Sequence, residues 1–195
     1  MMKMLVLTIC LFLCGCVEAP RKHQEEWFVT KEPHFFYKDI ADKWSGFRGL
    51  KWNTNIRDMN DPNMVLIYEN TKRRVSYYER QDDKLSIGKA DLSDLIYMCY
   101  KDRFFGVFIM VEGMSNFQYL KDAVFAHYGE GHKLDVLEDK WLWNSAIGAG
   151  VSNVTMTLKY DNIIKQAWLR IYYRPILYEQ KADNAKAATE AKSDF

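Results

Sequence analysis

The sequence predicts an α+β domain in which a mostly antiparallel sheet carries one main helix and one short helix on one face. Short runs rich in aromatic and β-branched residues alternate with polar turns, which is typical of strand hairpins. Only one stretch has the apolar spacing of a strong amphipathic helix. These two observations favour a meander of strands covered by helices.

Two hairpins are predicted in the first half of the domain. Residues 64–69 and 75–80 form the first, and residues 92–100 and 104–111 form the second. The run 104–111 is almost continuously apolar, whereas a strand with one solvated face alternates. We therefore expect it to be a central strand that is covered on both faces.

A last hairpin is predicted near the C-terminus. Residues 154–160 and 167–173 alternate between apolar and polar side chains, with Asp161-Asn162 as the turn. The segment Trp141-Leu142-Trp143 predicts one more strand before this hairpin. The expected arrangement is an antiparallel meander.

The main helix is predicted to begin at Ser115, a good N-cap residue, with Gln118 completing a capping box. Gly129 is expected to end it. Its sheet-facing stripe consists of Phe117, Leu120, Val124 and Tyr128. A second, shorter helix is expected to start near Thr54 or Asn55. Its residues Ile56 and Met59 are expected to point into the core.

The N-terminus carries the only recognisable sorting signal. Lys3 precedes the apolar run 4–12, and Leu13-Cys14-Gly15-Cys16 follows. The run is too short to span a bilayer, which takes about 20 apolar residues. This segment resembles the signal peptide and processing box of bacterial lipoproteins.

The resemblance implies cleavage after Gly15 and attachment of acyl chains to Cys16, which would hold the chain durably on a membrane. Val17 follows the cysteine instead of aspartate, which favours the outer membrane over the inner one under the sorting habit of enteric bacteria. The alternative is an ordinary secretory peptide cut near Ala19.

A second resemblance concerns the domain itself. The segments Phe47-Arg48-Gly49-Leu50-Lys51-Trp52, Tyr100-Lys101-Asp102-Arg103-Phe104 and Ser115-Asn116-Phe117 resemble a group of small bacterial lipoproteins of uncharacterised function. The likeness covers residues 44–178. More distantly, the chain is similar to small outer-membrane assembly lipoproteins. Neither resemblance implies a catalytic residue.

Composition divides the chain into four parts. Residues 1–15 are the expected signal peptide, and residues 16–43 are a polar tether with scattered aromatics. Residues 44–178 are long enough for one globular domain with a real core. Residues 179–195 have almost nothing apolar to bury, which predicts a disordered or frayed-helix tail.

The charge pattern does not indicate nucleic-acid binding. The formal net charge is +1, whereas nucleic-acid binders usually cluster lysine and arginine on one face. The compact basic run Lys72-Arg73-Arg74 falls between two predicted strands and is interpreted as a solvated hairpin tip. Cys99 lies in an apolar run and is expected to be a buried small hydrophobe.

No catalytic motif, cofactor motif or metal box is found in the sequence, so we expect a protein that is not an enzyme. His127 and His132 with Glu130 do not match the spacing of a standard zinc site. The carboxylate pairs Asp82-Asp83 and Glu138-Asp139 are adjacent, so in extended chain their side chains point to opposite faces.

The number of aromatic residues favours a recognition surface. The alternation of the last strand puts one set of side chains on the face opposite Leu169, Ile171 and Tyr173. This candidate binding face, for an envelope protein or a glycan, consists of Trp168, Arg170, Tyr172 and Arg174. The alternative is an outer face where long side chains cover the sheet. The same excess of aromatic residues predicts that some of a wider set are exposed, namely Trp52, Tyr77, Tyr78, Trp141, Trp143, Trp168 and Tyr172.

Three functional classes remain open from the sequence. The first is a lipid-anchored accessory or binding module of the cell envelope. The second is a component of envelope assembly. The third, and least favoured, is an enzyme that acts on envelope polymers, which requires a concave site with a perturbed acid or histidine.

Overall fold

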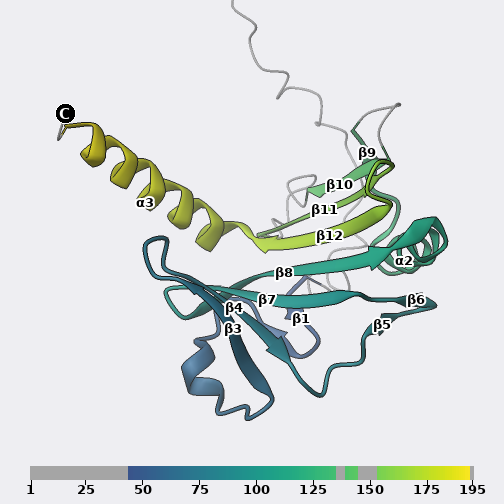
Figure 1. Cartoon of the computed structure of the whole chain (residues 1–195), viewed down its shortest axis with the longest axis horizontal. Helices are drawn as coiled ribbons and strands as arrows, with labels where there is room; N and C mark the ends of the chain where they lie inside the picture. The colour runs from purple at the N-terminus through teal and green to yellow at the C-terminus, as the bar shows by residue number, and fades with distance from the viewer. Residues whose placement is uncertain (1–43, 135–138, 145–152, 194–195) are drawn as a thin grey trace, which may run out of the picture. The chain divides into compact units, whose positions relative to one another are not determined.

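A computed structural model describes residues 44–134, 139–144 and 153–193. Eight strands form one antiparallel sheet in the spatial order β3-β4-β7-β8-β12-β11-β10-β9 (Figure 1). Their bounds are β3 Met64–Asn70, β4 Val75–Arg80, β7 Asp94–Tyr100, β8 Arg103–Glu112, β9 His132–Lys133, β10 Lys140–Asn144, β11 Val154–Asp161 and β12 Gln166–Tyr173. The predicted α+β class and the three predicted hairpins are confirmed.

Four very short strands stand outside this sheet. β1 (Gly46–Phe47) pairs with β2 (Leu50–Lys51), and β5 (Ser86–Ile87) pairs with β6 (Ala90–Asp91). Segments of two residues have no periodicity of their own, so the sequence did not predict them. They matter because the first of these hairpins borders a pocket of about 620 Å³.

The main helix, α2 (Gly113–Tyr128), buries Phe117, Leu120 and Val124, as predicted. Its start differs from the prediction, because the N-cap is Glu112 and Ser115 lies inside the first turn. Gly113 adopts φ 80°, and its N–H donates to the carbonyl of Lys165 at 2.8 Å. This long-range bond starts the helix before the serine, so the predicted capping box does not form.

The short helix is present as the 3-10 helix η1 (Ile56–Met59). Asn55 caps it, since its side-chain oxygen accepts a hydrogen bond from the Arg57 N–H at 3.0 Å. Ile56 is buried in the same core cluster as the α2 stripe. Both predicted helices therefore contribute to the core on the same face of the sheet.

The inner face of the sheet, which packs against α2, holds most of the core. Alternate strand residues point to it, with Tyr97 and Cys99 from β7, Val107 and Ile109 from β8, and Leu169 from β12 all buried. The central position of β8 agrees with the prediction from its apolar run, because Phe105 is buried on the opposite side.

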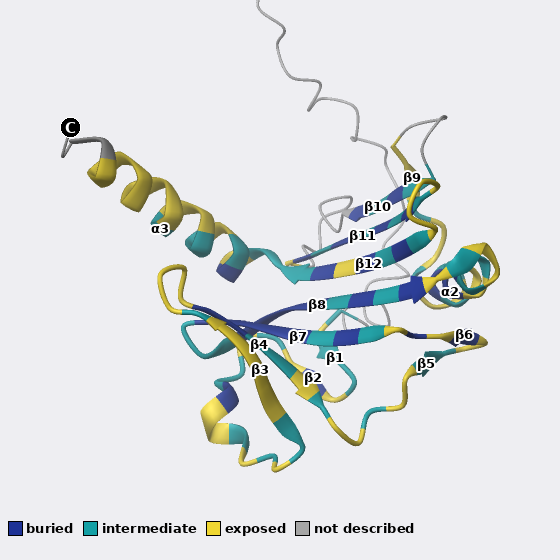
Figure 2. Cartoon of the chain, viewed as in Figure 1, coloured by how far each residue is buried: buried dark blue, intermediate teal, exposed yellow. Residues whose placement is uncertain are grey.

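A further helix, α3 (Arg174–Ser193), packs on that opposite, outer face. Ile176 from its first turn is buried among Val75, Met98, Tyr100 and Phe105. The boundary expected at Tyr178 thus falls inside a helix that continues directly from β12, and Arg174 begins that helix instead of extending the strand. Figure 2 shows α3 buried at its start and exposed beyond.

Ion pairs fix the middle of α3 to the turn between β7 and β8. Lys101 Nζ lies 3.0 Å from Glu179 Oε1 and 2.7 Å from Asp183 Oδ2, and Arg103 Nη2 lies 2.5 Å from Glu179 Oε2. Hydrogen bonds from Arg103 and Lys101 lower the pKa of Glu179, and those from Lys101 and Tyr100 lower the pKa of Asp183. Ile176 thus packs the start of α3 on the sheet, and these ion pairs connect its polar middle to the β7–β8 turn.

No helix in the described part of the chain is both long and apolar enough to cross a bilayer.

Candidate functional site

A pocket of about 620 Å³ opens between the β1–β2 hairpin and α2. Leu169 and Ile171 of β12 line it from the sheet, and Val124 lines it from the helix. Ligand pockets are typically concave and mostly apolar, and their volumes are roughly 300–1,000 Å³. The other described lining residues are Ser45, Gly46, Phe47, Arg48, Gly49, Leu50, Lys51, Ile87, Ala123, His127 and Tyr128. Two of the lining side chains, Arg48 and Lys51, carry a positive charge.

The β1–β2 hairpin that borders this pocket is unusually tight. Its two loop residues, Arg48 and Gly49, have φ 47° and 81°, which matches a two-residue turn whose twist suits antiparallel strands. Gly46 packs so closely on this turn that a Cβ atom there would lie 2.1 Å from the carbonyl oxygen of Leu50. Arg48 occupies a backbone region that costs a non-glycine residue energy unless other contacts hold it.

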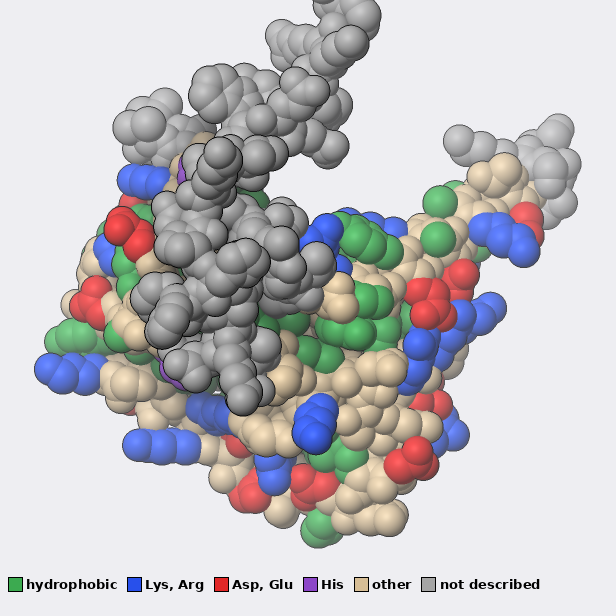
Figure 3. Space-filling model, turned by 180° about the vertical axis from the view of Figure 1, so that it is seen from behind, with side chains coloured by type: hydrophobic (Ala, Val, Ile, Leu, Met, Phe, Trp, Pro, Cys, Tyr) green, Lys and Arg blue, Asp and Glu red, His purple; other side chains and the backbone are tan. Residues whose placement is uncertain are grey.

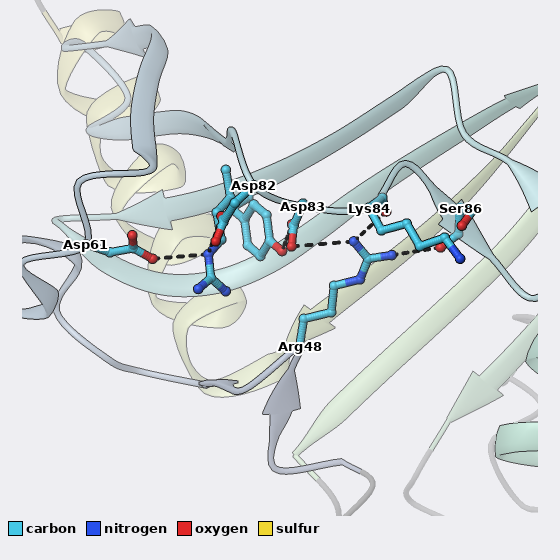
Figure 4. A network of polar contacts seen from close by, with 8 residues as sticks. Arg48, Asp61, Asp82, Asp83, Lys84 and Ser86 are labelled. Atoms are coloured by element: carbon cyan, nitrogen blue, oxygen red, sulfur yellow. Dashed lines mark hydrogen bonds and ion pairs between the residues drawn. The ribbon is translucent and has the colours of Figure 1, made fainter.

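Those contacts come from the Arg48 guanidinium, as Figure 4 shows. Nη1 donates to the Lys84 carbonyl at 2.8 Å, and Nη2 donates to the Ser86 carbonyl at 2.9 Å. Nη1 also lies 3.5 Å from Asp83 Oδ1. The arginine thereby ties the β1–β2 turn to the segment that leads into β5.

The Asp83 carboxylate also accepts a hydrogen bond from the Tyr97 hydroxyl. Burial, together with this bond to an anion, raises the pKa of Tyr97 well above its usual range. Tyr97 therefore stays protonated and acts as a hydrogen-bond donor. Asp83 thus interacts with Tyr97 and with Arg48, which come from distant parts of the chain. The network fixes one wall of the pocket.

The side chain of the adjacent residue, Asp82, points away from that of Asp83, as the sequence predicted for neighbouring acids. Asp82 Oδ1 lies 3.2 Å from Arg80 Nε, and Asp61 Oδ2 lies 3.1 Å from the same atom (Figure 4). Asp82 and Asp83 thus serve separate arginines. Their arrangement provides ion pairs instead of an acid and base on one bond.

The predicted binding face is only partly brought together. Trp168, Arg170 and Tyr172 share the outer face of β12, while Arg174 donates from Nε and Nη2 to the Tyr178 hydroxyl on α3. The Arg170 guanidinium lies 5.6 Å from the ring centroid of Phe108 and 5.7 Å from that of Trp168. Arg170 is exposed, and the two rings of the face are half-buried.

Other residues singled out in the sequence are more buried than expected. Trp141 and Trp143 are buried, and Trp52, Tyr77 and Tyr78 are half-buried. Cys99 is buried as predicted, and its burial raises the pKa of the thiol to about 12. The basic run 72–74 is exposed in the β3–β4 turn, also as predicted. Cys16 lies outside the described residues.

The described surface shows mixed charge and no metal cluster. Figure 3 shows lysine and arginine side chains interspersed with aspartate and glutamate on the face seen from behind. Within the described ranges, no group of three or more histidine, cysteine, aspartate or glutamate side chains is placed to hold a metal ion.

Comparison with known proteins places the chain in no family. No protein-family model, curated protein or solved structure matches it. Sequence reasoning missed the pocket, because its walls come from segments that are far apart along the chain. The one available signal was the Arg48-Gly49 pair between short apolar runs, which is consistent with a tight hairpin.

Proposed function

We propose that the chain is a lipid-anchored lipoprotein of the bacterial cell envelope, and that its folded domain is an accessory or binding module. The observation that carries this proposal is the segment Leu13-Cys14-Gly15-Cys16 at the end of a short apolar run behind Lys3. The outer membrane is the favoured location, because Val17 follows the cysteine.

The geometry supports binding as the role of the domain. The pocket between β1–β2 and α2 has an apolar interior with Lys51 and Arg48 at its border. An apolar group that carries an anionic or polar end suits such a site. Anchoring raises the local concentration of the module near envelope partners, so that even a weak affinity is sufficient.

The anchor is tested by growing cells with a labelled fatty acid. Label is expected on the wild-type protein and should be lost on Cys16→Ser, because only a thiol at the processing site accepts the diacylglycerol. Cys14→Ser is the matched control and should keep the label, since it changes the neighbouring cysteine only. Label that survives Cys16→Ser would refute the lipoprotein assignment.

The role of the pocket is tested by crosslinked copurification from membranes. Ala123→Trp places a large ring at the wall of the pocket and should reduce the captured partners. Ala126→Trp makes the same change at an exposed position of the same helix and should not reduce them. Equal capture by both variants, with matched thermal stability, would place the partner elsewhere on the domain.

A further inference from the structure

The turn between β11 and β12 carries two isoleucines that the fold does not use. Ile163 is 90% exposed and Ile164 is 56% exposed, and Figure 2 draws this end of the hairpin as exposed. β-Branched apolar residues are not the residues that turns require, since turns favour Gly, Asn, Asp, Pro and Ser. Side chains that break a local rule without a structural gain indicate a functional surface.

Other residues build the turn. The Asp161 carboxylate oxygen Oδ1 accepts the Ile163 N–H at 2.8 Å and the Ile164 N–H at 3.3 Å, and the first of these bonds contributes most to the lowered pKa of Asp161. Lys165 closes the turn with φ 57°. The isoleucine side chains are therefore held outward on a stiff turn to which they contribute little.

The apolar surface continues onto the start of α2. The Gly113 N–H donates to the Lys165 carbonyl at 2.8 Å, which fixes the helix beside the turn. Met114, the next residue, is 42% exposed. Three apolar side chains from two elements therefore share one end of the sheet.

Several lysines flank this turn. Lys165 lies in the turn, Lys159 precedes it on β11, and Lys140 pairs with Lys159 across the β10–β11 register. The opposing carboxylates are Asp161, which binds the turn amides, and the exposed Glu112. Asp139 lies 3.9 Å from Lys133, so these two charges offset each other.

We propose that the β11–β12 turn contacts the membrane, with Ile163 and Ile164 inserted among acyl chains and the surrounding lysines at anionic phospholipid headgroups. Two isoleucines and a methionine make too small a surface for a stable protein interface, which buries about 1,200 Å² or more. Insertion into lipid needs no such area, since each buried aliphatic side chain strengthens partitioning about tenfold or more. Lysines near an anionic surface add to this attraction.

The biological setting of this site rests on the proposed envelope function, but its test does not use the anchor. The mature chain, residues 16–195, carrying Cys16→Ser is sedimented with vesicles of phosphatidylethanolamine and phosphatidylglycerol, and separately with phosphatidylcholine vesicles. Binding is expected to the anionic vesicles and to be weaker to the neutral ones. The double variant Ile163→Asp and Ile164→Asp should bind about tenfold or more weakly.

Two matched variants sharpen this test. Leu66→Asp changes a residue that is 49% exposed on the edge strand β3 and should bind as the parent does. Lys165→Glu should weaken binding to the anionic vesicles alone. Circular dichroism checks that each variant is folded.

Several results would overturn the membrane contact. These are a parent chain that stays in the supernatant, equal losses for the isoleucine and Leu66 variants, and a dimer in ultracentrifugation that the isoleucine substitutions abolish. The last result would assign the turn to a second copy of the chain. If vesicle binding fails while Cys16 carries lipid, only this site is refuted, and the envelope proposal stands.

Discussion

The two faces of the eight-stranded sheet are covered in different ways. The inner face packs against α2 through side chains that are almost completely buried, such as Phe117 and Leu120. Among the described residues, the outer face is covered by α3 at one end, and its remaining aromatics, such as Trp168 and Phe108, are half-buried. Most of the buried apolar surface of the described residues therefore lies on the inner face, while the outer face and the turns expose more side chains.

The largest effect is expected from the inner face. Phe117→Ala removes a completely buried ring that stacks on Tyr160 with centroids 4.9 Å apart. Truncation of a buried phenylalanine lowers the free energy of unfolding by about 3–5 kcal/mol. Urea unfolding measures this loss, and a change below about 1 kcal/mol would show that the inner face is not the main core.

The next effect is expected where α3 meets the outer face. Ile176→Ala removes the side chain that the helix buries among Tyr100 and Phe105, which should cost about 2–4 kcal/mol. Amide hydrogen exchange is expected to rise in α3 and to change little in α2. Ala187→Gln, at an exposed position of α3, is the control, because glutamine forms helices well. Unchanged exchange in α3 of the Ile176 variant would contradict the packing of this helix.

The inner face and α3 differ in how far their structure follows from the sequence. The hairpins, the α2 stripe and the buried Cys99 follow from local periodicity, and the structure has them where they were expected. The start of α2 was wrong because the Gly113–Lys165 bond joins distant segments. For residues 179–195 the sequence left a disordered tail and a frayed helix open, and the structure has a helix as far as Ser193. The ion pairs of Glu179 and Asp183 with Lys101 on the β7–β8 turn join distant segments, and no local pattern reveals them.

In the candidate site, too, the local features were predictable from the sequence and the long-range contacts were not. The alternation of Trp168, Arg170 and Tyr172 was predicted from the period of a strand, but Arg174 was wrongly added to that face. The proline that follows it, Pro175, suits the first turn of a helix and marks the change from β12 to α3. The pocket depends on Arg48 reaching the carbonyls of Lys84 and Ser86. A contact between residues this far apart leaves no periodic trace in the sequence.

Acid is expected to loosen α3 before the inner core. The folded-state pKa values of Glu179 and Asp183 are lowered. Their ionised carboxylates therefore stabilise the folded state above their unfolded pKa values of about 4, and this stabilisation is lost as the pH falls below that range. For Lys101, hydrogen bonds to Asp183 and Glu179 raise the pKa. The charged Lys101 therefore stabilises the folded state below about pH 10, and this stabilisation is lost only in stronger alkali.

Hydrogen exchange of α3, corrected for intrinsic rates, measures this acid response between pH 6 and pH 3, values that bracket about pH 4. The double variant Glu179→Gln and Asp183→Asn is the control and should respond much less to acid, because its docking no longer depends on ionised carboxylates. An identical acid response of parent and variant would exclude these ion pairs as its cause.

The smallest effect on stability is expected from the exposed part of the outer face. Arg170→Ala removes contacts of the guanidinium with Phe108 and Trp168, which are worth about 0.5–1 kcal/mol at such a site. If this face binds an envelope protein or a glycan, copurified partners should fall although stability hardly changes. Unaltered partners would leave Arg170 with a covering role only.

The proposed envelope role depends on the proposed lipid anchor at Cys16. The most direct measurement is intact mass spectrometry of the protein extracted from envelopes. The expected result is a chain that begins at Cys16 and carries the mass of a diacylglycerol with its acyl chains. An unmodified amino terminus, or a chain that retains residues 1–15, would contradict it.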